Sequence, residues 1–154
     1  MTLQIDSTVS EETERFAHSL GSKLRGGEVI VLTSDLGGGK TTFVRGIAKG
    51  MGSEDHVSSP TFTISREYAA GKLTLYHFDF YRLHEPGVVA AELAEFLNDP
   101  QAVVVIEWGD IVEAVLPAER LTIRIEHTGD TTRRLYLQCP QSLAYLLPKE
   151  SIPV

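Results

Sequence analysis

TSDLGGGKTTFVRG, from Thr33 to Gly46, is the stretch of sequence that decides the fold. The residues before it, EVIVLT (28–33), predict a buried strand, and those after it have the spacing of an amphipathic helix. Glycines between these elements let main-chain N–H groups approach phosphate oxygens, while Lys40 adds a positive charge and Thr41 a hydroxyl for Mg²⁺. The stretch therefore predicts a phosphate-binding loop. The residues expected to contact a nucleotide there are Leu36, Gly37, Gly38, Gly39, Lys40, Thr41 and Thr42.

Ser34 departs from the pattern G-x-x-x-x-G-K-[ST], which has glycine at its first position. A serine is tolerated there if its φ is negative, and costs about 1–2 kcal/mol if the backbone is left-handed. The phosphate contacts come from later amides and from the helix N-terminus, so we expect the loop to bind phosphate despite the serine. The alternative is a glycine-rich turn that precedes a lysine by chance, which the flanking strand and helix disfavour.

Two acidic residues follow predicted strands. Glu107 ends VVVIE, and Asp79 ends the second strand of a predicted hairpin. A carboxylate in such a position can hold Mg²⁺ or organise the attacking water. We expect Thr41 and Glu107 to hold the metal and Asp79 to organise water, with Lys40, Asp79 and Glu107 as the catalytic set. The sequence does not decide which acid contacts the metal, and an isolated strand-end acid is otherwise a solvated charge.

The rest of the chain predicts alternating strands and helices. Thr8 and Glu11 have capping-box spacing at the start of the first helix. The segments 61–69 and 72–80 form an antiparallel hairpin on this interpretation. Strands are expected at 2–6, 28–33, 61–69, 72–80, 102–108, 120–127 and 133–139. Helices are expected from Thr8 to Gly26, from the glycine loop to Gly50, and at 85–99, 111–116 and 140–147.

This pattern predicts an α/β fold: a P-loop NTPase-like three-layer domain with a mixed, mainly parallel sheet, an antiparallel hairpin and antiparallel edge strands. A chain of 154 residues without a linker-like segment suits a single domain over 1–154. The net charge of −7 argues against direct binding to nucleic acid. We expect a cytoplasmic protein without a membrane segment, in which the single cysteine, Cys139, packs as a small hydrophobic residue.

Two further residues near the predicted site have ordinary explanations. His77 and Asp79 share one face of their strand, but no third ligand is evident, so a transition-metal site is not expected. Trp108 follows Glu107 directly, and strand alternation would turn it to the opposite face, where core or surface packing is expected.

Four motifs in order, GGGKTT, SSPTF, YHFDFYRL and VVVIEWGD, resemble the bacterial TsaE (YjeE) family over the whole chain. That family consists of P-loop ATPases needed to make threonylcarbamoyladenosine beside the tRNA anticodon. The resemblance implies ATP or ADP and Mg²⁺ as cofactors and TsaB and TsaD as partners, with tRNA contacted only indirectly. Ser34 and Gly38 depart from the family's usual GDLGAGKTT, where glycine and alanine stand.

The resemblance also implies roles for residues outside the loop. Ser10 and an arginine of the TTRR turn, Arg133 or Arg134, would border the base and ribose; the alternative is a solvated strand charge. Thr61, in SSPTF, would sense the γ-phosphate; the alternative is an ordinary strand start after Pro60. Trp108 would lie near the site or near a partner surface.

Three functions are open at this stage. The first is an Mg²⁺-dependent ATPase, slow alone and stimulated by its partners, that drives a tRNA-modifying assembly. The second is a small-molecule kinase, which the absence of arginine from 84–99 disfavours. The third is a nucleotide-gated binding module in which hydrolysis is incidental. A GTPase is disfavoured because the chain has no N-K-x-D motif.

Overall fold

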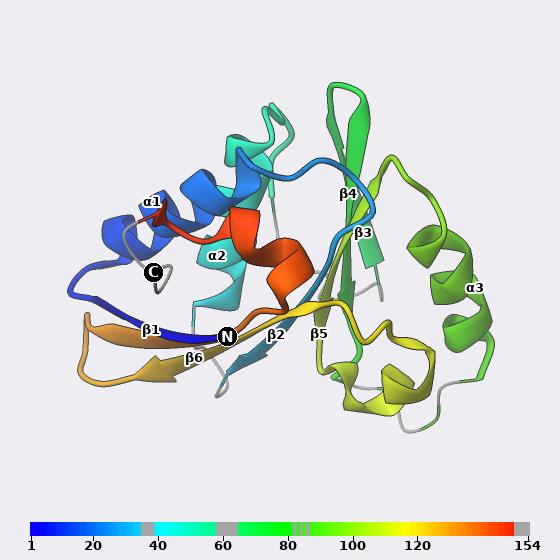
Figure 1. Ribbon diagram of the computed structural model, residues 1–154. Coiled ribbons are helices and arrows are strands. Elements are labelled where there is room, and N and C mark those ends of the chain that lie inside the picture. The colour runs from blue at the N-terminus through cyan, green and yellow to red at the C-terminus, as the bar shows by residue number, and fades with distance from the viewer. Residues whose placement is uncertain (35–38, 58–64, 82, 84, 86, 150–154) are drawn as a thin grey trace.

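A twisted sheet divides the molecule into layers (Figure 1). The computed structural model describes residues 1–34, 39–57, 65–81, 83, 85 and 87–149. Within these residues the sheet has seven strands in the order β1-β7-β6-β2-β5-β4-β3. The strands are β1 (Thr2–Ser7), β2 (Val29–Ser34), β3 (Ser65–Ala70), β4 (Leu73–Asp79), β5 (Ala102–Glu107), β6 (Leu121–His127) and β7 (Arg133–Gln138).

The four central strands, β6, β2, β5 and β4, are parallel. On either side of them, β7 and β3 pair antiparallel to β6 and β4, and β1 pairs antiparallel to β7. Of the four parallel strands, β2 and β5 are the most apolar, as expected for strands buried on both faces. All six residues of β5 are buried. The predicted mixed sheet with a mainly parallel centre, an antiparallel hairpin and antiparallel edges is confirmed.

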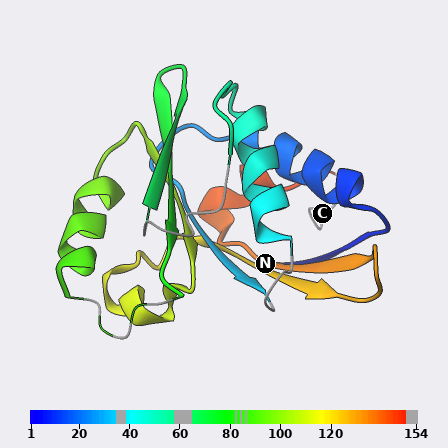
Figure 2. The same ribbon diagram turned by 180° about the vertical axis from the view of Figure 1, so that it is seen from behind.

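Strand alternation distributes the core between the two faces of the sheet. Val103 and Val105 of β5 pack with the first cluster, and Val104 and Ile106 pack with the second. Figures 1 and 2 show α1 (Ser10–Gly21) and α2 (Lys40–Gly50) on one face and α3 (Gly87–Leu97) on the other. The 3₁₀ helix η2 (Gln141–Leu146) joins the first cluster, and η1 (Gly109–Val115) joins the second.

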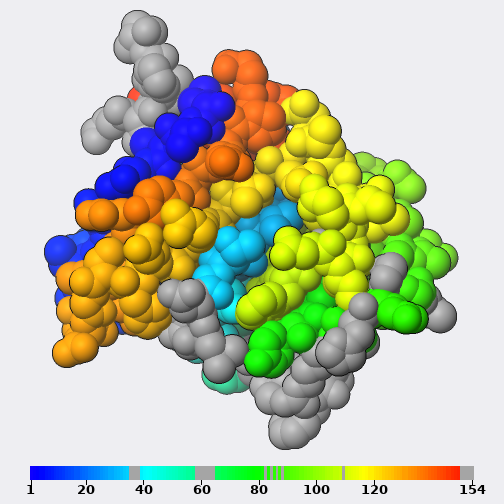
Figure 3. Space-filling view, turned by 90° about the horizontal axis from the view of Figure 1, so that it is seen from below, coloured from blue at the N-terminus to red at the C-terminus, as the bar shows by residue number. Residues whose placement is uncertain are grey.

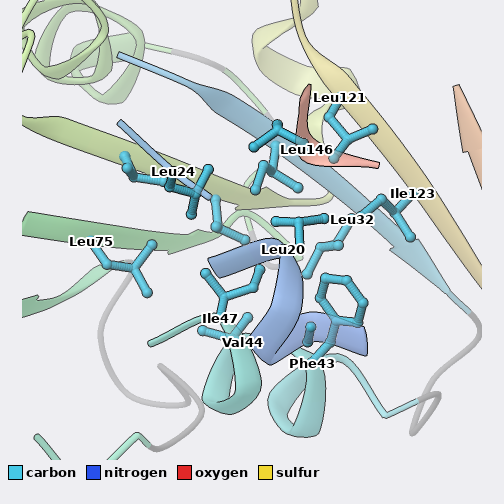
Figure 4. Close-up of a cluster of buried hydrophobic side chains, with 14 of the residues drawn as sticks. Leu20, Leu24, Leu32, Phe43, Val44, Ile47, Leu75, Leu121, Ile123 and Leu146 are labelled. Carbon is cyan, nitrogen blue, oxygen red and sulfur yellow. The ribbon is translucent and has the colours of Figure 1, made fainter. Parts of the chain in front are cut away.

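The larger cluster holds α2 against the sheet. Leu20 of α1 and Phe43, Val44 and Ile47 of α2 are fully buried and converge on Leu32 of β2 (Figure 4). Burial of one such side chain contributes about 1.5–3 kcal/mol. The helix that follows the glycine loop is therefore fixed by its apolar face, and its N-terminus has a defined place relative to β2.

Glycines let α1 and α2 approach closely. A Cβ on Gly46 would lie 2.6 Å from Ala17 Cβ and 2.7 Å from the Glu14 carbonyl oxygen. A Cβ on Gly50 would lie 2.1 Å from the His18 carbonyl oxygen. The backbones thus occupy the space that any larger residue would need, and these positions require glycine for packing rather than for a turn.

The predicted capping box at the first helix is wrong. The helix begins at Ser10 with Val9 as its N-cap, and among the described residues no side chain caps it in the usual way. Glu12 instead accepts hydrogen bonds from the Thr8 amide and the Thr8 hydroxyl, both at 2.9 Å. Because the helix begins at Ser10, Glu12 rather than the adjacent Glu11 is placed to bind Thr8.

The other predicted elements agree with the structure within a few residues. The hairpin is antiparallel, with Ala70 opposite Leu73; its predicted first residues, 61–64, lie outside the described part of the chain. Cys139 is buried, as expected. The two short C-terminal helices have 3₁₀ geometry. In the ranges that the structure describes, no helix combines the length and apolarity needed to cross a bilayer.

Because α1 and α2 approach so closely, we expect a glycine-to-alanine substitution in α2 to destabilise the protein, although alanine favours helix formation. Gly→Ala inside a helix ordinarily adds about 1 kcal/mol of stability. We expect Gly46→Ala to lower the free energy of unfolding by about 1–3 kcal/mol, because the new methyl overlaps the backbone of α1. Urea denaturation measures the change.

Ala17→Gly supplies the control, because it removes the methyl group that Gly46→Ala would strike. We expect the variant that carries both Gly46→Ala and Ala17→Gly to have a larger free energy of unfolding than the sum of the two single changes predicts. A stabilised Gly46→Ala protein would contradict the packing described for α1 and α2.

Candidate functional site

The N-terminus of α2 lies beyond the carboxyl end of β2. Gly39 is the N-cap and has φ 91° and ψ 18°, a left-handed conformation that favours glycine. No described side chain caps the helix. The amides of its first turn, which includes Lys40, Thr41 and Thr42, therefore suit an anionic ligand.

The remainder of the predicted loop lies outside the described residues. Leu36, Gly37 and Gly38 belong to this part, and the structure does not test their predicted contacts. Ser34 is described and ends β2, paired with Ile125 of β6. Among the described non-glycine residues only Trp108 has a positive φ, so Ser34 avoids the left-handed conformation that would have strained it. The end face of the sheet shows β2, in light blue, between β6–β7 and the segment that follows β5 (Figure 3).

The two predicted acidic residues lie side by side. The parallel register of β4 and β5 pairs Asp79 with Glu107. Both residues lie on the face that carries Leu75 and Val105, which is the face that α2 covers. Glu107 is only 4% exposed, so its carboxylate has little access to bulk water. The sheet therefore places two carboxyl groups on the side from which Lys40 approaches.

Burial raises the pKa of Asp79, and the neighbouring Glu107 carboxyl raises it further. Two contacts oppose this increase in the pKa: the Tyr81 amide donates to Oδ1 of Asp79 at 3.0 Å, and the Lys40 charge lies nearby. Two carboxyl groups in contact repel each other when both are ionised, so a divalent cation between them and the helix would be favoured.

His77 makes a contact that the sequence did not predict. It is fully buried, and its Nε2 lies 3.3 Å from Oε1 of Glu107. The distance permits an ion pair, but neither ring nitrogen has a hydrogen bond within the described residues. An unsatisfied buried polar group costs about 1–3 kcal/mol. The H-x-D spacing drew attention to His77 as a partner of Asp79, whereas its contact is with the acidic residue of the adjacent strand.

Trp108 does not follow the strand alternation predicted for it. Its φ of 59° and ψ of 50° end β5 abruptly and turn the side chain away from the core. The ring is 38% exposed, lies 5.1 Å from the Lys40 ammonium and packs against Tyr81 with centroids 5.0 Å apart. Of the two expected environments, core and surface, Trp108 therefore has the surface one, and the left-handed residue at the strand end breaks the two-residue period.

Of the two candidate arginines, Arg133 lies beside the helix N-terminus. Its Nε would lie 3.9 Å from a Cβ built on Gly39, while its Nη1 donates to the Thr132 carbonyl at 2.9 Å. Arg134 instead pairs with Asp6 of β1 at 2.7 Å. Ser10 begins α1 three residues after Ser7, which pairs with Arg133 in the sheet.

The remaining predicted nucleotide contacts are not tested. Thr61 lies outside the described residues, and binding of the base by Ser10 or Arg133 stays a prediction.

These residues fit a nucleotide with Mg²⁺. No described side chain caps the first turn of α2, a lysine stands at its start, and the Glu107 carboxyl contributes to the raised pKa of Asp79. Among the described residues no three His, Cys, Asp or Glu side chains form a metal cage. That arrangement suits Mg²⁺, which is commonly held by one or two carboxylates together with substrate phosphates.

Fold and site together define a three-layer α/β fold with a seven-stranded mixed sheet and with paired acidic residues at the ends of two central strands. The chain matches the family model "Threonylcarbamoyl adenosine biosynthesis protein TsaE" over residues 7–135. The chain therefore belongs to the TsaE family of tRNA threonylcarbamoyladenosine biosynthesis proteins.

Individual relatives agree with this assignment. The TsaE protein of Bacillus subtilis is 42% identical over 125 residues, which are 81% of this chain and 78% of that protein. The TsaE protein of Treponema pallidum is 38% identical over 136 residues, which are 84% of this chain and 95% of that protein. The crystal structure of Bacillus subtilis YdiB superposes with a TM-score of 0.75 at 34% identity, covering 95% of this chain and 91% of that one.

The raised pKa of Asp79 predicts a pH-dependent penalty on the folded protein. The folded state holds this proton more tightly than the unfolded state, so stability falls as pH rises from the ordinary value of 3.8 through the raised value. We expect Asp79→Asn to melt at a higher temperature than the unsubstituted protein at pH 7 in EDTA. The difference should shrink as the pH falls below 3.8.

Thermal melting from pH 3 to pH 8 measures this effect, with the exposed Asp110→Asn as a control that should follow the unsubstituted protein. If Asp79→Asn destabilises the protein at pH 7, burial and the Glu107 carboxyl do not raise the pKa of Asp79 in the folded state.

Proposed function

We propose that this chain is an ATP-binding, Mg²⁺-dependent ATPase that supports TsaB and TsaD in forming threonylcarbamoyladenosine on tRNA. The observation that carries the proposal is the pairing of Asp79 with Glu107 beside Lys40 at the start of α2. Membership of the TsaE family supports the place in tRNA modification. The negative net charge favours action on a protein complex over direct binding to RNA.

Each side chain has a role in this proposal. The amides of the first turn of α2 and the Lys40 ammonium would bind the phosphates, because both place positive charge at one point. Thr41 and Glu107 would hold Mg²⁺, which supplies charge neutralisation at the phosphate oxygens when bound. Asp79 would orient the attacking water, since it lies beside Glu107 and keeps partial exposure at the strand end.

Arg133 would contact the nucleotide rather than act as a mobile catalytic arginine. Its Nη1 is held by main-chain carbonyls of the β6–β7 turn, including that of Thr132. An arginine that stabilises the transition state contributes about 10³–10⁵-fold in comparable enzymes. We propose that turnover is slow in the isolated chain and that TsaB and TsaD accelerate it.

Removing the phosphate-binding lysine tests the proposal. We expect Lys40→Ala to lower ATP turnover at least about 100-fold, because the charge opposite the transferred phosphate is lost. Phosphate release is measured at saturating Mg²⁺, with and without purified TsaB and TsaD, and the rate of the unsubstituted protein should rise when both are present.

Lys49→Ala is the matched control. Lys49 lies on the same helix but near its other end, where it pairs with Glu14 at the surface. Its loss should leave turnover unchanged. If the unsubstituted protein binds no nucleotide at millimolar ATP, or if TsaB and TsaD leave its rate unaltered, the proposed function is wrong.

A further inference from the structure

The contact between His77 and Glu107 is not used by the function proposed above. His77 is fully buried on β4, two residues before Asp79 and on the same face of the sheet. Its neighbours on that face include Leu75, and Val105 lies opposite it in the parallel register. A leucine or valine would suit such surroundings without leaving polar atoms unpaired. The presence of an imidazole therefore calls for a partner, and the Glu107 carboxylate supplies one.

The contact joins one nitrogen of the imidazole to one oxygen of the carboxylate. His77 Nε2 lies 3.3 Å from Oε1 of Glu107, while Glu107 is paired with Asp79 across the two strands. Carboxylates that hold metal ions are commonly oriented by a second residue, and loss of that residue typically lowers metal affinity or activity by about 10–100-fold. His77, which is fully buried, is placed to orient the Glu107 carboxylate in this way.

We propose that His77 is a positioning residue for the Glu107 carboxylate, engaging Oε1 so that the carboxylate keeps one orientation toward the metal-nucleotide site. This inference rests on the proposed function, because it assigns Glu107 to Mg²⁺. His77 would thus contribute to the site without touching either the nucleotide or the metal. In its contact with Glu107, Nε2 would be the donor and Oε1 of Glu107 the acceptor.

A direct readout of metal binding tests the inference. Mn²⁺ serves as the probe, and its binding in the presence of ADP is followed by electron paramagnetic resonance. We expect His77→Leu to weaken Mn²⁺ binding about 10-fold, while ADP binding in EDTA is unchanged. A residue that only fills the core would not separate the two measurements.

Two polar substitutions keep the test decisive if His77→Leu fails to fold. Glutamine carries its amide nitrogen close to the position of Nε2, whereas asparagine is shorter and mimics Nδ1. We expect His77→Gln to bind Mn²⁺ within about 3-fold of the unsubstituted protein and His77→Asn to show the about 10-fold loss. If His77→Asn binds Mn²⁺ as the unsubstituted protein does, the inference is overturned.

A double-mutant cycle with Glu107→Gln shows whether His77 acts through Glu107. We expect His77→Asn to change Mn²⁺ affinity little once Glu107 is replaced, because its only route to the metal is gone. Equal effects of His77→Asn in both backgrounds would overturn the inference. Absence of Mn²⁺–ADP binding by the unsubstituted protein would instead refute the proposed function, so the two failures are distinguishable.

Discussion

The parallel pairing of β4 with β5 is the constraint on which the site depends. It sets Asp79 opposite Glu107 and turns both carboxyl groups toward the face covered by α2. A shift of one residue in either strand would move its acidic residue to the opposite face. The buried residues that flank the pair, Phe78 on one face and Val105 on the other, hold the register. The core thus maintains an arrangement that its own electrostatics disfavour.

The phosphate-binding part of the candidate site, the N-terminus of α2 with Lys40, is positioned by packing rather than by polar contacts. The apolar face of α2 fixes the direction of the helix, and Gly46 lets α1 lie directly against it. Lys40, at the first turn, then lies near Asp79 and against the exposed ring of Trp108. Trp108 holds a left-handed backbone conformation, which is unusual for a bulky residue and is characteristic of functional sites.

The sequence predicted the sheet, its layers and the two acidic residues because these follow from periodicity and motif. It did not predict the left-handed conformation of Trp108, since a single left-handed residue at a strand end interrupts the alternation without any local sequence signal. The choice of Glu12 over Glu11 depended on where α1 begins, which propensity leaves open by a residue or two. The sequence contained one weak indication for His77, a polar residue on the same strand face as the apolar Leu75. Its partner, Glu107, lies on β5 and could be identified only from the strand register. The single-domain assignment and the nucleotide contacts of the loop stay predictions.

The most direct measurement is a crystal structure of the protein with Mg²⁺ and a non-hydrolysable ATP analogue. The account predicts phosphate oxygens at hydrogen-bond distance from the amides of the first turn of α2 and from Lys40. It also predicts that the cation lies about 2.0–2.1 Å from oxygen atoms of Thr41 and Glu107, or reaches Glu107 through one water molecule. Phosphates bound elsewhere on the molecule, or a cation remote from both Asp79 and Glu107, would contradict it.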